Sequence, residues 1–171
     1  MKVRINQEKT LDFIIMLVMK FIKPWIVLVT FISTVLVGIC QDKEHETVLI
    51  SSFVKDAFFT KAKSKNLADQ FIIFPDLSNS KYTHEDRLKI FDKHLKKIRE
   101  DKKNQLDTTD FQITPYQFYN KDKVKFSEEY TRDIFVLISR KKPIMYFLMK
   151  NHRILSFDYI IKGDEGLFIT Y

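Results

Sequence analysis

Asp158 is the acidic residue whose neighbours in the sequence best fit a chemical role. It lies between Phe157 and Tyr159, in an apolar stretch typical of a β-strand. An inward-facing carboxyl would have its pKa raised by burial, and such a group can act as a general acid or base in a pocket. The strand alternation instead favours Phe157 and Tyr159 facing the core, with Asp158 facing solvent. Asp158 is therefore a catalytic candidate and not an assigned catalytic residue.

The other residue types that carry chemistry form no recognisable pattern. The histidines are His45, His84, His94 and His152, and no two of them have the spacing of a zinc-binding pair. Adjacent Glu128 and Glu129 would point to opposite sides of an extended segment, which does not suit a glycosidase pair. With 3 Gly the chain has no phosphate-binding or nucleotide-binding loop motif. We therefore expect no metal and no cofactor, and we favour a non-enzymatic protein.

Aromatic residues and lysines dominate the composition. The chain has 16 Phe and 7 Tyr, and five aromatic residues that could form a ligand platform are Tyr116, Phe118, Tyr119, Phe126 and Tyr130. Core packing is the expected role of most of them. The net charge is +7, but only six of the 29 basic residues are Arg, the side chain best suited to phosphate and base recognition. Nucleic acid is thus not an expected partner.

The first forty residues have the order of an export signal. Lys20 and Lys23 precede a run of sixteen uncharged residues, Trp25 to Cys40, and the polar QDKEHE follows. A basic flank, an apolar run and a polar continuation are typical of a secretory signal peptide. The basic flank would stay in the cytoplasm. We therefore expect the domain that follows to lie on the non-cytoplasmic side, either secreted or tethered to the membrane.

Three fates of residues 25–40 are compatible with this order. Cleavage after Cys40 suits the small residues Gly38 and Cys40 and is the favoured fate. Retention as an anchor comes second, since sixteen residues are short against the roughly 20 that a span needs. Lipidation of Cys40 comes third: Val37-Gly38-Ile39-Cys40 resembles the lipobox of bacterial lipoproteins but has Ile39 where a small residue is usual. Met19 is an alternative start to Met1, because it also precedes a conventional signal sequence.

Beyond the leader we predict a linker at 41–46 and a single domain at 47–171. Apolar residues recur at helical spacing from Thr47 to Phe58. A second helix is predicted at 83–101, where Thr83 is the N-cap, Asp86 completes a capping box and the core stripe is Leu88, Phe91, Leu95 and Ile98. The apolar residues 71–74 before Pro75 fit either a short strand or a helix end.

Strand patterns follow the helices. They cover 111–119, 134–139, 144–149, 154–161 and 167–171, with turns at RKKP, at Asn151-His152 and at Gly163–Gly166. Helices followed by consecutive strands indicate an α+β fold: a signal or anchor helix, then two or three helices on an antiparallel meander of four to five strands.

Some of these strands are apolar on both faces, which a sheet with one solvated face does not need. Tyr146 and Leu148 oppose Met145 and Phe147 in this way. We predict a curled sheet with a small apolar cavity and an outer face left partly open for association. In element order, 47–171 resembles the NTF2-like and cystatin-like folds. The favoured function is binding of a protein or a small apolar ligand, and the alternative is an NTF2-like hydrolase or isomerase that uses Asp158.

Overall fold

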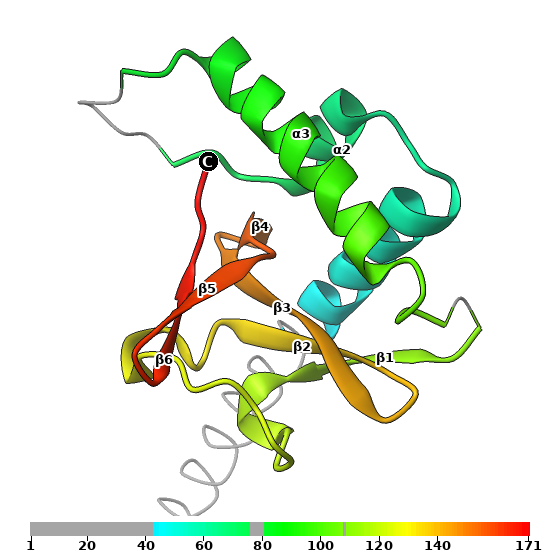
Figure 1. The fold of residues 1–171 in the computed structure, drawn as a ribbon, viewed down its shortest axis with the longest axis vertical. Coiled ribbons are helices and arrows are strands. Elements are labelled where there is room, and N and C mark those ends of the chain that lie inside the picture. The colour runs from blue at the N-terminus through cyan, green and yellow to red at the C-terminus, as the bar shows by residue number, and fades with distance from the viewer. Residues whose placement is uncertain (1–42, 76–80, 108) are drawn as a thin grey trace, which may run out of the picture. The chain divides into compact units, whose positions relative to one another are not determined.

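The computed structural model describes residues 43–75, 81–107 and 109–171, which form an α+β domain (Figure 1). The chain divides into two units after Asp42. The predicted signal or anchor helix, Cys40 and the two alternative starts lie outside the described residues. Within the described part of the chain, no helix combines the length and the apolar character needed to cross a membrane.

The first described helix carries the apolar stripe that the sequence predicts. Residues 43–54 are α-helical and continue into the π-helical segment η1 (Lys55–Phe59). The helix buries Ile50, Phe53, Val54 and Ala57 completely. Residues 43–46 of the predicted linker are also helical, and Glu46 is buried, so the linker prediction is wrong for these four residues. These four residues are polar, and a helix is predicted from the spacing of its apolar residues, so the prediction placed the start of the helix too late.

The helices α2 (Ser64–Phe71) and α3 (His84–Lys102) complete the helical layer. The boundaries of α3 agree with the predicted ones to within one residue. The capping box is present: the Thr83 hydroxyl accepts from the backbone N–H of Asp86, and the Asp86 carboxylate accepts from the backbone N–H of Thr83, both at 3.2 Å. Phe91, Leu95 and Ile98 are buried as predicted, whereas Leu88 is only partly buried.

The strands form a four-stranded antiparallel meander and a separate hairpin. The meander has the order β1 (Phe111–Pro115), β2 (Ile134–Ser139), β3 (Lys142–Lys150) and β4 (Arg153–Ser156), and the hairpin consists of β5 (Tyr159–Lys162) and β6 (Glu165–Phe168). The 3-10 segments η2 (Tyr116–Phe118) and η3 (Glu128–Tyr130) lie between β1 and β2. Two-residue turns at Arg140-Lys141 and Asn151-His152 have positive φ, as tight hairpins require.

Two predicted strands are shorter than expected. The strand predicted at 154–161 is broken after Ser156, whose buried hydroxyl lies 3.0 Å from the carbonyl oxygen of Asp158 and 2.5 Å from that of Ile169. The strand predicted at 111–119 ends at Pro115.

Residues 71–74 combine both predicted alternatives, since Phe71 ends α2 and Ile72 forms a bridge with Ile154 of β4.

Both faces of the meander are covered by the chain itself. The helices cover one face, where Met145 and Phe147 are 3% and 0% exposed (Figure 1). Tyr146 and Leu148 point to the other face and are 3% and 4% exposed. The residues that cover this second face are Tyr116, Tyr119 and Phe126, together with Tyr159 and Phe168 of the hairpin. The prediction of a partly open outer face is therefore wrong, because these residues form an aromatic layer that covers the face where we expected a partner.

Candidate functional site

Asp158 lies in the connection between β4 and β5 and contacts α3. Its Oδ2 is 2.7 Å from Nε2 of His94, and Nδ1 of His94 is hydrogen-bonded to the hydroxyl of Tyr171. We call these three residues the Asp158 cluster. The Asp158 carboxylate is partly exposed and contacts His94, so it lies between the solvent-facing and the buried orientation that the sequence offered. Its side chain is 27% exposed and that of His94 is 15% exposed, while Tyr171 is buried.

The charges in this cluster follow from its contacts. Burial would raise the pKa of Asp158, but the hydrogen bonds from His94 and the backbone of Tyr159, with the nearby charge of Lys102, hold that pKa below its usual value. Burial, and to a lesser degree the carboxylate of Asp158, raises the pKa of Tyr171. Asp158 is thus ionised and Tyr171 is neutral near pH 7. When Nε2 of His94 donates to Asp158, Nδ1 can accept from the Tyr171 hydroxyl.

This arrangement can orient an imidazole but does not present it to a substrate. In a catalytic carboxylate–histidine pair, the second ring nitrogen faces the reacting group. Here the second nitrogen of His94 is occupied by Tyr171, whose ring packs against Phe91 and Phe157 at centroid distances of 5.4 and 5.9 Å. The cluster therefore links α3, the β4–β5 connection and the segment after β6. In the sequence, the position of His94 next to Leu95, at the border of the apolar stripe of α3, is the feature that indicates partial burial.

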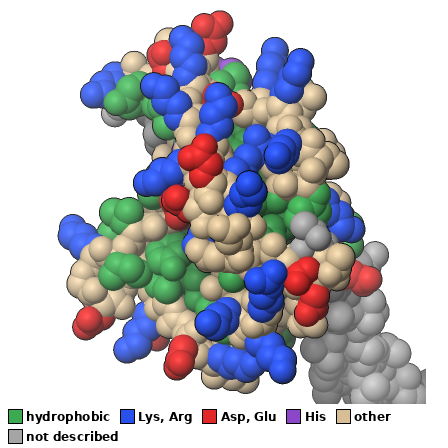
Figure 2. Space-filling model, turned by 45° about the vertical axis from the view of Figure 1, so that its right-hand side comes forward, with side chains coloured by type: hydrophobic (Ala, Val, Ile, Leu, Met, Phe, Trp, Pro, Cys, Tyr) green, Lys and Arg blue, Asp and Glu red, His purple; other side chains and the backbone are tan. Residues whose placement is uncertain are grey.

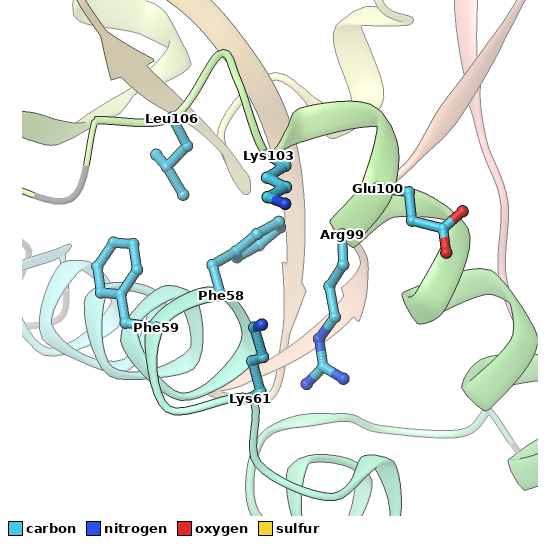
Figure 3. A pocket seen from close by; sticks show the side chains of 7 residues that line it. All are labelled: Phe58, Phe59, Lys61, Arg99, Glu100, Lys103 and Leu106. Carbon is cyan, nitrogen blue, oxygen red and sulfur yellow. The ribbon is translucent and has the colours of Figure 1, made fainter.

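A pocket lies where the first helix ends beside the C-terminal end of α3 (Figure 3). We call it the basic pocket, and its volume is about 450 Å³. It is lined by Phe58, Phe59, Lys61, Arg99, Glu100, Lys103 and Leu106. Its two halves lie some forty residues apart in the chain, so no local sequence pattern predicts it.

Arg99 holds the wall of the basic pocket in place. Its Nε donates to the carbonyl oxygen of Ala57 at 2.6 Å, and its Nη2 donates to that of Ala62 at 2.8 Å. The Ala57 carbonyl lies in the last turn of the first helix, where intrahelical partners run out, and the Ala62 carbonyl lies in the connection to α2. Burial lowers the pKa of Arg99, which remains charged at neutral pH because its ordinary pKa is so high. The pocket thus combines aromatic walls with a fixed cation.

The remaining predicted residues do not gather at either place. Three of the five proposed platform aromatics are buried in the aromatic layer on the second face of the meander, whereas Phe118 and Tyr130 are 72% and 43% exposed. Glu128 and Glu129 are exposed in η3, which is not the extended segment that we expected. His45, His84 and His152 are exposed. In residues 43–75, 81–107 and 109–171, no group of three or more potential ligand side chains could hold a metal ion.

The surface carries cations over most of the face shown in Figure 2, with hydrophobic side chains gathered at the left of that view. One exposed apolar group belongs to the β5–β6 hairpin. Ile160, Ile161 and Leu167 are 54%, 59% and 41% exposed, and Ile160 is the cross-strand partner of Leu167.

Comparison of the chain with protein families, with curated proteins and with solved structures finds no match. The chemistry of the sites therefore has to be inferred from their own geometry.

Proposed function

We propose that residues 43–171 form a non-enzymatic binding domain that holds a small, mainly apolar ligand in the basic pocket. The observation that carries this proposal is the pocket's combination of size and lining. A volume of about 450 Å³ falls in the range of small-molecule sites, and Phe58 and Phe59 are only partly buried within the protein. A ligand would remove their remaining apolar surface from water, which is favourable.

The proposal includes the location and the finer fold expected from the sequence. The domain is exported, and residues 25–40 tether it if they are not cleaved. Its helices followed by a meander support a likeness to the cystatin-like or NTF2-like arrangement. Determining the mass of the mature protein in separated cell fractions tests cleavage, lipidation of Cys40 and compartment together. A mature mass that includes residues 1–40 in the soluble cytoplasmic fraction would contradict export.

Ligand content tests the binding function. The full chain is purified from its native source with a solubilising polymer in place of detergent. Bound small molecules are then extracted and identified by mass spectrometry. We expect close to one molecule per chain, and much less in a Phe58→Asp variant, because a charge in the pocket wall opposes an apolar ligand. Ile160→Asp is the matched control, since it changes an exposed apolar residue of the hairpin. Equal ligand content in the two variants, or none in the wild type, would refute the proposal.

A hydrolase or isomerase that uses Asp158 is the second candidate. The 2.7 Å contact between Asp158 and His94 favours it, because a carboxylate beside an imidazole is a common element of acid–base sites. This function requires Tyr171 to release Nδ1 of His94. Acylation by diethyl pyrocarbonate distinguishes the two candidates: a closed cluster predicts that His94 reacts much more slowly than exposed His84 and His152. Modification of His94 at their rate would favour the enzyme.

A further inference from the structure

We propose that the ligand of the basic pocket is a small amphipathic carboxylate, with its apolar body against Phe58, Phe59 and Leu106 and its anionic group between Lys61 and Lys103. This inference rests on the proposed binding function and specifies the ligand class for the same pocket. Figure 3 shows the Lys61 and Lys103 side chains extending toward the Phe58 side chain from opposite sides, while the Glu100 carboxylate points away.

The two lysines have no anionic partner within the described part of the chain. The ion pairs found in residues 43–75, 81–107 and 109–171 include neither Lys61 nor Lys103. Both residues are exposed at the mouth of the pocket, and they come from different elements: Lys61 follows η1, and Lys103 follows α3. Lysine carries a mobile ammonium on a long chain, so both can reach a shared anion without a change of fold.

The helix ends do not cancel this positive charge. Two helices end at the pocket, and each C-terminus acts as roughly half a negative charge. Arg99 offsets the first of these ends directly, since it binds the carbonyl of Ala57 in η1. With Glu100 counted as one negative charge, the three cations still leave the pocket with about one positive charge. An anion is therefore favoured over a neutral molecule, and a cation is disfavoured.

The apolar walls disfavour a purely polar anion such as phosphate. Two phenylalanines and Leu106 supply the walls, and a bare anion would lose hydration there without replacing it. A molecule with a short alkyl or aryl body and one carboxylate suits both parts of the site. Each hydrogen bond between an ammonium and a carboxylate is charge-assisted and stronger than a neutral one.

Three probes with the same phenyl group and the same chain of three methylenes test this inference: 4-phenylbutyrate, 3-phenylpropanol and 3-phenylpropylammonium. The full chain is held in lipid nanodiscs, binding is measured by calorimetry, and the signal of empty nanodiscs is subtracted. We expect the carboxylate to bind about tenfold more tightly than the alcohol, a difference of about 1.4 kcal/mol, and the ammonium to bind most weakly. Raising the salt concentration should reduce this ratio, because the lysines are exposed.

Lysine variants show whether the preference arises in this pocket. Lys61→Gln and Lys103→Gln together should reduce the ratio of carboxylate to alcohol affinity to one or below, because the pocket then has no net positive charge, while alcohol binding is retained. Lys97→Gln, an exposed lysine on α3 that does not line the pocket, should leave the ratio unchanged. Equal affinity of the wild type for all three probes would overturn the carboxylate assignment and leave the binding function intact. Failure of all three probes to bind would overturn the binding function itself.

Discussion

Replacing Asp158 with Asn should weaken the domain at neutral pH and have little effect in acid. A hydrogen bond to a charged group contributes about 1.5–3 kcal/mol, and a neutral one about 0.5–1.5 kcal/mol. In Asp158→Asn the amide oxygen can still accept from Nε2 of His94, so only the charged part of the interaction is lost. We expect the free energy of unfolding to fall by about 1 kcal/mol at pH 7, because the side chain is only 27% exposed.

The pH dependence follows from the lowered pKa of Asp158. A carboxyl whose pKa is lower in the folded state contributes stability above its unfolded pKa of about 3.9, and this contribution is lost as the pH falls through the folded value. The difference between wild type and Asp158→Asn should therefore shrink below about pH 4.

Urea unfolding monitored by circular dichroism at a series of pH values measures this difference. Asp122→Asn, a change at an exposed carboxylate, is the matched control and should differ little from wild type at any pH. A difference between wild type and Asp158→Asn that is absent at pH 7, or that grows as the pH falls, would show that the cluster does not stabilise the fold through the charge of Asp158.

Three further predictions concern the fold and the leader. A protein of residues 41–171 should be soluble and unfold cooperatively. Leu95→Ala, at a side chain with no exposed surface, should lower its free energy of unfolding by about 2–5 kcal/mol. A loss under about 0.5 kcal/mol would show that the apolar stripe of α3 is not part of the core. Gly166→Ala places a Cβ 2.5 Å from Cε1 of Phe126 and should cost about 1–3 kcal/mol, whereas Gly163→Asn, at φ 63° in open space, should cost far less in the same assay. A reporter active only outside the cytoplasm should work when fused after residue 50, and Asp at Val29, Ile32 and Val35 should abolish its activity; a working cytoplasm-only reporter at that junction would contradict export.

Local signals in the sequence predicted the elements that local interactions determine. The capping box at Thr83 and the spacing of Phe91, Leu95 and Ile98 defined α3 to within one residue. The Asn151-His152 turn was predictable because a two-residue hairpin needs positive φ, which Asn tolerates. The start of the first helix was missed because its opening turn is polar.

Contacts between distant segments were not predictable from the same sequence. His94 and Asp158 are 64 positions apart, and neither residue carries a sign of the other. The apolar residues Tyr146 and Leu148 indicated that the second sheet face needs a cover, but we predicted a face partly open for association, whereas the chain itself buries it. They could not indicate what covers it, because strand alternation specifies a face and not its partner. The covering residues, such as Phe126, were expected in the core but were not assigned to this face.

The most direct test of the account is the position of a bound carboxylate on the protein. Intermolecular nuclear Overhauser effects between the ring protons of 4-phenylbutyrate and the isotope-labelled full chain report that position. We predict contacts to Phe58, Phe59 and Leu106. Contacts confined to the exposed hairpin residues Ile160, Ile161 and Leu167 would contradict the account and place ligand binding on the β5–β6 hairpin instead.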